Sequence, residues 1–204
     1  MSLTAVLHRH ATRIVLIGIA GAVVALALSL VQPLRYRATM RLLIIQSTSP
    51  TLDAFTAVKS AEKIGRNLGQ IVTSSSFLAS VLQTNAAIDQ SVFSRVEQRR
   101  RRTWERMVET AVASETSVME VRVYHPVQAQ ARMIAETIGG ILVRDIRVYT
   151  GSRDLEARVI DSPLVSRYPV RPNIPLNTAL GLILGLILGT AIAYLREPRH
   201  HGSA

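Results

Sequence analysis

Two long stretches near the ends of the chain contain only uncharged, mostly apolar residues. They cover residues 14–32 (IVLIGIAGAVVALALSLVQ) and 174–195 (IPLNTALGLILGLILGTAIAYL). At ~1.5 Å per residue, a helix of roughly 19 residues reaches about 29 Å, which matches the ~30 Å hydrocarbon core of a bilayer. The pattern therefore predicts two transmembrane helices with one region of about 140 residues between them.

Between these helices, polar and apolar residues alternate in three places, as they do in half-buried β-strands. The strands are expected at residues 36–44, 117–124 and 155–160. In the first of them, Arg37, Thr39 and Arg41 fall on the face opposite the apolar side chains. The first and last strands each run directly into a membrane helix, so the sequence predicts that they pair in one small sheet.

Apolar residues three or four positions apart predict four helices in the same region. Asp53 is the expected N-cap of the first, Pro126 opens the last at a position where its missing N–H costs nothing, and Gly151 lies at a C-cap. The predicted helices are residues 53–72, a short one capped by the serines at 74–76, residues 89–113, and residues from 126 to about 150. The expected fold is α+β, with two transmembrane helices flanking a domain that holds a small mixed sheet and several helices.

The charges beside the two apolar runs predict the orientation of the chain. Short flanks that hold arginine and histidine are retained in the cytoplasm, whereas loops beyond ~60 residues cross the membrane largely regardless of charge. A cleaved signal peptide is the alternative for the first run, but the run stays apolar beyond the small residues at which cleavage would fall. The expected parts are a cytoplasmic N-terminal tail (1–13), a first transmembrane helix (14–32), an extracytoplasmic domain (33–173), a second transmembrane helix (174–195) and a cytoplasmic C-terminal tail (196–204).

The charge and the cysteine content of the chain exclude several classes of partner and site. The chain carries a formal net charge of +10 and no cysteine. In a soluble protein such a charge would suggest a nucleic-acid partner, but most of it falls in the domain expected outside the cytoplasm. There, the available anions are lipid headgroups, lipid-linked phosphates and acidic glycans. The absence of cysteine excludes disulfides and thiolate metal sites within this sequence.

Four consecutive arginines, Arg99, Arg100, Arg101 and Arg102, form the densest charge run in the sequence. One interpretation is a solvated helix face, partly paired with Glu105 and other glutamates at helical spacing. Another is a contact site for an anionic glycan or lipid pyrophosphate, because guanidinium groups bind phosphates bidentately. A subunit interface is the third.

Small residues and prolines mark the second apolar run and its approach. Gly181, Gly185 and Gly189 recur every four residues, a spacing that lets two membrane helices pack closely, although glycine is also simply common in such helices. The proline-rich segment (163–175) is expected to be extended and stiff. Its prolines are Pro163, Pro169, Pro172 and Pro175.

The sequence offers no recognisable catalytic constellation. It holds neither a phosphate-binding glycine loop nor a Ser/His/Asp arrangement, so we expect neither enzymatic activity nor a cofactor. The histidines near the two ends would form a metal site only if the tails met, and no metal site is expected.

Three motifs, in this order, resemble the chain-length determinant (Wzz-type) family of polysaccharide co-polymerases, in the short form without a fused kinase. They are the Tyr36-Arg37-Ala38 entry into a strand after the first span, the stretch VMEVRVYHPVQAQARMIAETI, and the run VIDSPLVSRYPVRPNIPLNTALGLILGLILG. The resemblance covers nearly the whole chain.

This resemblance implies a non-catalytic scaffold in the plasma (inner) membrane of a bacterium, which regulates the chain length of a lipid-linked O-antigen, capsule or exopolysaccharide. The implied partners are further copies of the chain, a membrane polysaccharide polymerase, the lipid-linked glycan, the lipid bilayer and a separate cytoplasmic tyrosine kinase; nucleic acid is not among them. The alternative is a membrane-anchored sensor or adaptor whose outer domain binds a small ligand.

Overall fold

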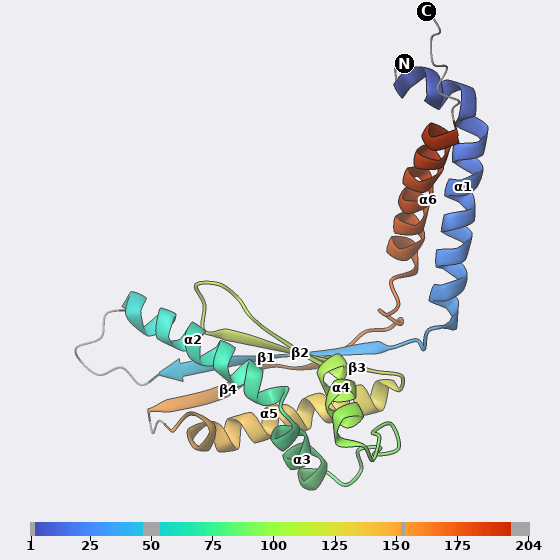
Figure 1. The fold of residues 1–204 in the computed structure, drawn as a ribbon. Helices are drawn as coiled ribbons and strands as arrows, with labels where there is room; N and C mark the ends of the chain where they lie inside the picture. Colours follow the sequence, from blue (N-terminus) through green and yellow to red (C-terminus); the bar gives the residue numbers. More distant parts are fainter. Residues whose placement is uncertain (1–2, 47–53, 152–153, 197–204) are drawn as a thin grey trace, which may run out of the picture. The chain divides into compact units, whose positions relative to one another are not determined.

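A computed structural model describes residues 3–46, 54–151 and 154–196, and these form two compact units. Unit 1 comprises Met1–Leu34 with Arg171–Ala204, and unit 2 comprises Arg35–Val170. The elements in chain order are α1 (Leu3–Val31), β1 (Tyr36–Gln46), α2 (Ala54–Val72), α3 (Ser75–Thr84), α4 (Glu97–Met107), β2 (Val108–Val112), β3 (Val118–His125), α5 (Gln128–Thr150), β4 (Leu155–Val165) and α6 (Ile174–Arg196) (Figure 1). The expected N-cap Asp53 and residues 197–204 of the expected C-terminal tail lie outside the described residues, whereas residues 3–13 of the expected N-terminal tail form the first part of α1.

The strands of unit 2 form a four-stranded sheet in the order β2-β3-β1-β4. The predicted pairing of the first and last strands is confirmed, since Leu43 of β1 lies opposite Arg158 of β4. All three strand pairs are antiparallel, so the prediction of a mixed sheet is wrong. For two of the pairs the connections give the reason: β1 leaves one membrane helix and β4 returns to the other, and a short turn joins β2 to β3.

One face of the sheet carries the hydrophobic core of unit 2. Met40, Leu42 and Ile44 of β1 and Met119 and Val121 of β3 are almost fully buried. Helix α5 packs along β1 and β4, and α2 lies against β2. Figure 1 shows α3, α4 and α5 on this side of the sheet. The strict alternation of strand residues therefore orients a buried face towards the helices and leaves an opposite face bearing the charged side chains.

The predicted helix over residues 89–113 is wrong at both ends. The chain is irregular from residue 89 to 96, α4 covers only Glu97–Met107, and the next five residues form strand β2. Val108, Thr110 and Val112 favour a strand because they are β-branched and occupy alternate positions. Val108 also continues the apolar phase of α4, so periodicity alone does not separate the two elements.

The ends of α3 and α5 depend on local caps. Ser74 caps α3 as predicted, because its hydroxyl accepts a hydrogen bond from the Phe77 amide at 3.2 Å. Gly151 ends α5 in the left-handed conformation, at φ 68°, which confirms its predicted role. Pro126 does not open that helix: α5 begins at Gln128 with Val127 as its N-cap, so the proline lies just before the cap.

The last strand is longer than predicted and takes Pro163 out of the expected proline-rich extended segment. β4 continues to Val165, and its pairing with β1 is irregular between Asp161 and Leu164. A proline is tolerated there because β4 is an edge strand, where the missing N–H breaks no ladder bond. Pro169 and Pro172 lie in the connection after the strand, and Pro175 lies in the first turn of α6, where no N–H is required.

Unit 1 is a pair of long apolar helices, α1 and α6 (Figure 1). Residues His10–Val31 and Ile174–Leu195 are long and apolar enough to cross a membrane. Most of their large apolar side chains are exposed, among them Leu30, Ile183 and Leu188. Two exposed apolar helices at the two ends of an α+β fold fit a membrane protein, because a bilayer would cover the surface that they leave open.

Candidate functional site

Helix α4 holds the arginine run and is the most basic element of unit 2. Its sequence is EQRRRRTWERM, with Glu97 in the first turn and Arg106 in the last, an order that suits the helix dipole. Only Trp104 and Met107 are buried, so a narrow apolar stripe attaches the helix to the core. Arg100 and Thr103 are half-buried, and the other side chains of the helix are polar or charged and exposed.

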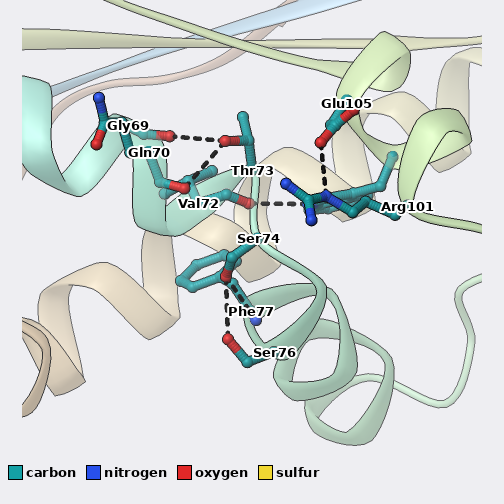
Figure 2. Close-up of polar contacts among 10 residues, drawn as sticks. Gly69, Gln70, Val72, Thr73, Ser74, Ser76, Phe77, Arg101 and Glu105 are labelled. Atoms are coloured by element: carbon teal, nitrogen blue, oxygen red, sulfur yellow. Dashed lines mark hydrogen bonds and ion pairs between the residues drawn. The ribbon is translucent and has the colours of Figure 1, made fainter. Parts of the chain in front are cut away.

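Trp104 fixes α4 against the end of α2. Its side chain is fully buried, and the indole N–H donates to the Val72 carbonyl oxygen at 2.8 Å. The receiving turn is itself ordered, because the Thr73 hydroxyl donates to the Gln70 carbonyl at 3.0 Å. Figure 2 shows this turn next to Arg101 and Glu105. The tryptophan therefore places a helix with few buried residues at a defined position.

The four arginines of the run do not share one environment. Arg99, Arg101 and Arg102 are exposed, whereas Arg100 is half-buried. Arg101 Nε donates to Glu105 Oε1 at 2.8 Å, an exposed i,i+4 ion pair of the kind that contributes little to stability. Within the described part of the chain, no ion pair is formed by the other three. Their guanidinium groups are thus available for an external anion.

The glycines of α6 lie against α1 of the same chain. A Cβ placed on Gly185 would lie 2.6 Å from the Ile17 carbonyl oxygen and 2.9 Å from Gly18 Cα. A Cβ on Gly181 would collide with Ala25, and one on Gly189 would lie 3.1 Å from Ile14 Cα. The stripe therefore brings two helix backbones into contact; a side chain at Gly181 or Gly185 would collide with the partner helix, and one at Gly189 would fit only tightly.

A polar bond adds to this packing near one end of the helix pair. Asn177 Nδ2 of α6 donates to Ser29 Oγ of α1 at 2.9 Å, and Ser29 is almost fully buried. Such interhelical bonds contribute about 0.6 kcal/mol on average within membranes. The bond fixes the register of the two helices, because a shift by one residue would break it.

A row of charges crosses the open face of the sheet, and the sequence did not point to it as a site. Glu120 of β3 accepts from Arg122 and also from Arg41 of β1 at 3.3 Å, and Arg41 reaches Asp161 of β4 at 3.6 Å. These side chains line a shallow cavity of about 470 Å³. Burial raises the pKa of Glu120, but the hydrogen bonds from Arg122 and Arg41 outweigh it, so the net pKa is lowered. The alternation of polar residues in each strand predicts that one face of the sheet is polar. Which charged side chains pair on that face depends on the register of the strands.

His125 ends β3 in a buried position. Its Nδ1 accepts a hydrogen bond from the Val127 amide at 3.0 Å, and within the described residues its Nε2 has no partner. Burial lowers the pKa of His125 below its ordinary value of 6.5, and the 3.3 Å contact between Nδ1 and the Val127 carbonyl oxygen and the charge of Asp89 oppose this less strongly. The imidazole is therefore neutral at pH 7, and its hydrogen bond joins the end of β3 to the N-cap of α5.

We expect the stability of unit 2 to fall as the pH drops below 6.5. Between that value and the lower pKa of the folded state, the unfolded chain binds more protons than the folded one, so stability decreases on acidification by at most about 1.4 kcal/mol per pH unit. The single tryptophan reports unfolding, and the other four histidines lie outside unit 2. In His125→Asn, which keeps an acceptor for Val127, stability between pH 7.5 and 5.5 should be flat; an equal slope in both proteins would contradict the assignment.

Metal ligands do not gather in the part of the chain that the structure describes: no group of three or more His, Asp or Glu side chains could hold an ion there. His200 and His201 are two of the terminal histidines considered above as metal ligands, and they lie outside the described residues. The features that the structure does bring together are a basic helix, a charged sheet face and a packed helix pair.

These features define a class of protein: one α+β unit whose two ends continue into helices long enough to span a membrane. Residues 144–198 match the GNVR family model, described as "G-rich domain on putative tyrosine kinase". The matched region runs from the end of α5 through β4 and the prolines into α6. It supports the broad family to which the motifs point, that of proteins associated with polysaccharide co-polymerases. No relative of the chain was found among curated proteins.

Proposed function

We propose that this chain is a non-catalytic membrane scaffold that regulates the chain length of a lipid-linked bacterial cell-surface polysaccharide. The observation that carries the proposal is the GNVR match over residues 144–198, because it covers the segment that joins the outer domain to the second membrane helix. In this proposal the protein lies in the inner membrane with unit 2 on the outer side, and it acts with further copies of itself beside a separate polymerase.

The arrangement of unit 2 suits such a role. Its first and last residues are adjacent, since the Val170 amide donates to the Arg35 carbonyl at 2.8 Å. Both membrane helices therefore leave the domain at one place, and side-by-side copies would present equivalent surfaces. The exposed arginines of α4 offer contacts for an external anion. Length control would then depend on geometry and transient contacts, without bond chemistry.

A kinase enters the proposal only as a partner. The description of the matched family mentions a tyrosine kinase, but this sequence holds no glycine-rich phosphate loop of the GxxxxGK[ST] type. We propose that the tyrosine kinase acts as a separate cytoplasmic partner of these residues. The alternative function, a sensor or adaptor with a ligand-binding outer domain, is favoured only by the shallow cavity on the charged sheet face.

The expected topology can be tested with single cysteines, because the natural chain contains none. Ser91 and Ser114 are exposed in unit 2, and Ser203 lies in the expected cytoplasmic tail. On cells with a permeabilised outer membrane, cysteines at Ser91 and Ser114 should react with a membrane-impermeant thiol reagent, and one at Ser203 should react only after lysis. Labelling of the Ser203 variant alone in intact cells would invert the topology.

The function itself is tested by deleting the gene and sizing the surface polysaccharide on a gel. We expect the polysaccharide still to be made, but with its preferred length lost, and a plasmid copy should restore that length. A sensor would instead change the amount of polysaccharide or the expression of its genes. Unchanged length together with altered amount in the deletion strain would reject the scaffold and favour the sensor.

A further inference from the structure

Four segments of unit 2 meet at the edge from which the membrane helices emerge. This anchor edge comprises residues 35–39, 85–108, 124–132 and 164–170. The strand register brings them together, because Ala38 of β1 lies opposite Val123 of β3 and Val165 of β4, and Val123 lies opposite Val108 at the start of β2. Helix α4 ends at Met107, so its last residue adjoins this edge.

The segment that precedes α4 is also held at this edge. The preceding segment is bonded to the first turn of α5, since the Asp89 amide donates to Gln130 Oε1 at 3.0 Å and Gln130 Nε2 donates to the Ala87 carbonyl at 3.1 Å. Gln128 in the same turn donates to the Ser166 carbonyl at 3.1 Å, next to the exit towards α6. Hydrogen bonds from the first turn of α5 thus connect Ser166, near the exit towards α6, to the segment that precedes α4.

The positive charge of unit 2 is concentrated at the anchor edge. Its four segments hold ten arginines or lysines against three acidic residues, whereas the rest of Arg35–Val170 holds nine against ten. The remainder of the unit is therefore nearly neutral. An uneven distribution of this kind is typical of a surface that binds an extended anion and not of charge that only maintains solubility.

Exposed apolar and aromatic side chains accompany these arginines. Val92 and Val96, just before α4, are 36% and 53% exposed, and Tyr168 is 70% exposed beside Arg167, whose guanidinium lies 5.7 Å from the tyrosine ring centre. Tyrosine favours the level of the lipid headgroups, and segments that lie on a membrane surface combine lysine or arginine with apolar side chains. The same edge therefore combines both components of interfacial binding.

We propose that the anchor edge binds the phosphate groups of anionic phospholipids in the leaflet beneath it, with the arginines of α4 as the main contacts. The covalent connections favour this partner. Only four residue steps separate Val31, the end of α1, from Arg35, and four separate Val170 from Ile174, the start of α6. At ~3.5 Å per residue, each connection spans about 14 Å at most. The edge cannot move far from a bilayer that contains the two helices.

The proposal can be tested on the full-length protein in lipid nanodiscs. A cysteine at Ser91, in the anchor edge, carries a fluorophore, and a fraction of the lipid headgroups carries a quencher. A cysteine at Ser114, in the β2–β3 turn at the opposite end of the sheet, is the positional control. We expect quenching at position 91 to be at least about twofold stronger with 30% phosphatidylglycerol than with phosphatidylcholine alone, and the difference to disappear in 0.5 M salt. Position 114 should not respond.

Two variants distinguish binding by the arginines from the effect of the short covalent connections to the membrane helices. Replacing Arg99, Arg100, Arg101 and Arg102 with Gln should abolish the response to phosphatidylglycerol. Removing four exposed charges elsewhere should preserve it; the matched set is Lys63, Arg144, Arg147 and Arg158, all changed to Gln. Unchanged emission of Trp104 shows in each variant that α4 is still in place. Equal quenching in both lipids, equal loss in both variants, or a response only when a polyprenyl pyrophosphate is added would overturn the proposal.

Discussion

Replacing Gly185 with Leu should separate the two membrane helices, the largest structural effect that we expect from a single substitution. A Cβ at this position already lies 2.6 Å from the Ile17 carbonyl and 2.9 Å from Gly18 Cα, so the obstacle is backbone that cannot rotate away. Overpacking of this kind costs about 1–3 kcal/mol. We expect smaller oligomers in mild detergent and a disturbed polysaccharide length, while unit 2 remains folded.

The separation can be measured directly with a cysteine pair. Asn177 and Ser29 are hydrogen-bonded across the helix pair, so cysteines at these positions should form a disulfide readily on mild oxidation. Adding Gly185→Leu should reduce this cross-linking strongly. Ala179→Leu is the matched control, because it adds similar bulk to an exposed position of the same helix. Undiminished cross-linking and an unchanged length profile in Gly185→Leu would mean that the glycine stripe reflects composition alone.

Changing all four residues Arg99–Arg102 to Gln should shift or broaden the length distribution of the polysaccharide in cells. Each exposed contact with an anion is worth only about 0.2–1 kcal/mol, so a single substitution should have little effect, whereas four together remove roughly 1–4 kcal/mol. Gln keeps a helix propensity close to that of Arg, and Trp104 still attaches α4 to Val72. The amount of protein in the membrane should therefore stay the same.

The comparison with a second quadruple variant makes this expectation specific. Lys63, Arg144, Arg147 and Arg158 are exposed and lie away from the anchor edge, so changing them to Gln removes the same charge without touching α4. That variant should give the normal length. If both variants behaved alike, total charge and not its position would matter. If the α4 variant gave a normal amount and a normal length, the arginine run would be only a solvated helix face.

Strong periodicity made much of this fold predictable from the sequence. The two apolar runs became α1 and α6, and the alternation around Arg41 and Val121 became β1 and β3. Strand β2 was missed because five residues are too few to separate a period of 2 from one of 3.6, and Val108 fits both. Gly69 of α2 is a sequence signal that another segment packs closely against this helix. That segment is β2, because a Cβ on Gly69 would lie 2.5 Å from Thr110 Oγ1.

The candidate sites also differ in whether the sequence alone could predict them. The arginine run and the glycine stripe are local in sequence, so spacing alone was enough to single them out. The row joining Arg41, Glu120 and Asp161 is not local, since it depends on the register of three strands. The same applies to the anchor edge, because only the folded sheet brings the segment of α4 beside the two chain exits. Sequence patterns therefore indicate which residues are unusual, whereas the fold determines which of them act together.

The central claim is that the chain sets polysaccharide length without making the polymer, and a titration in a deletion strain tests it most directly. The wild-type chain is expressed from an inducible promoter, and both the length distribution on a gel and the total polysaccharide per cell are measured at each level. The scaffold predicts that a defined preferred length returns as expression rises, while the total stays nearly constant. A total that rises with induction, at a length distribution that never changes, would contradict it.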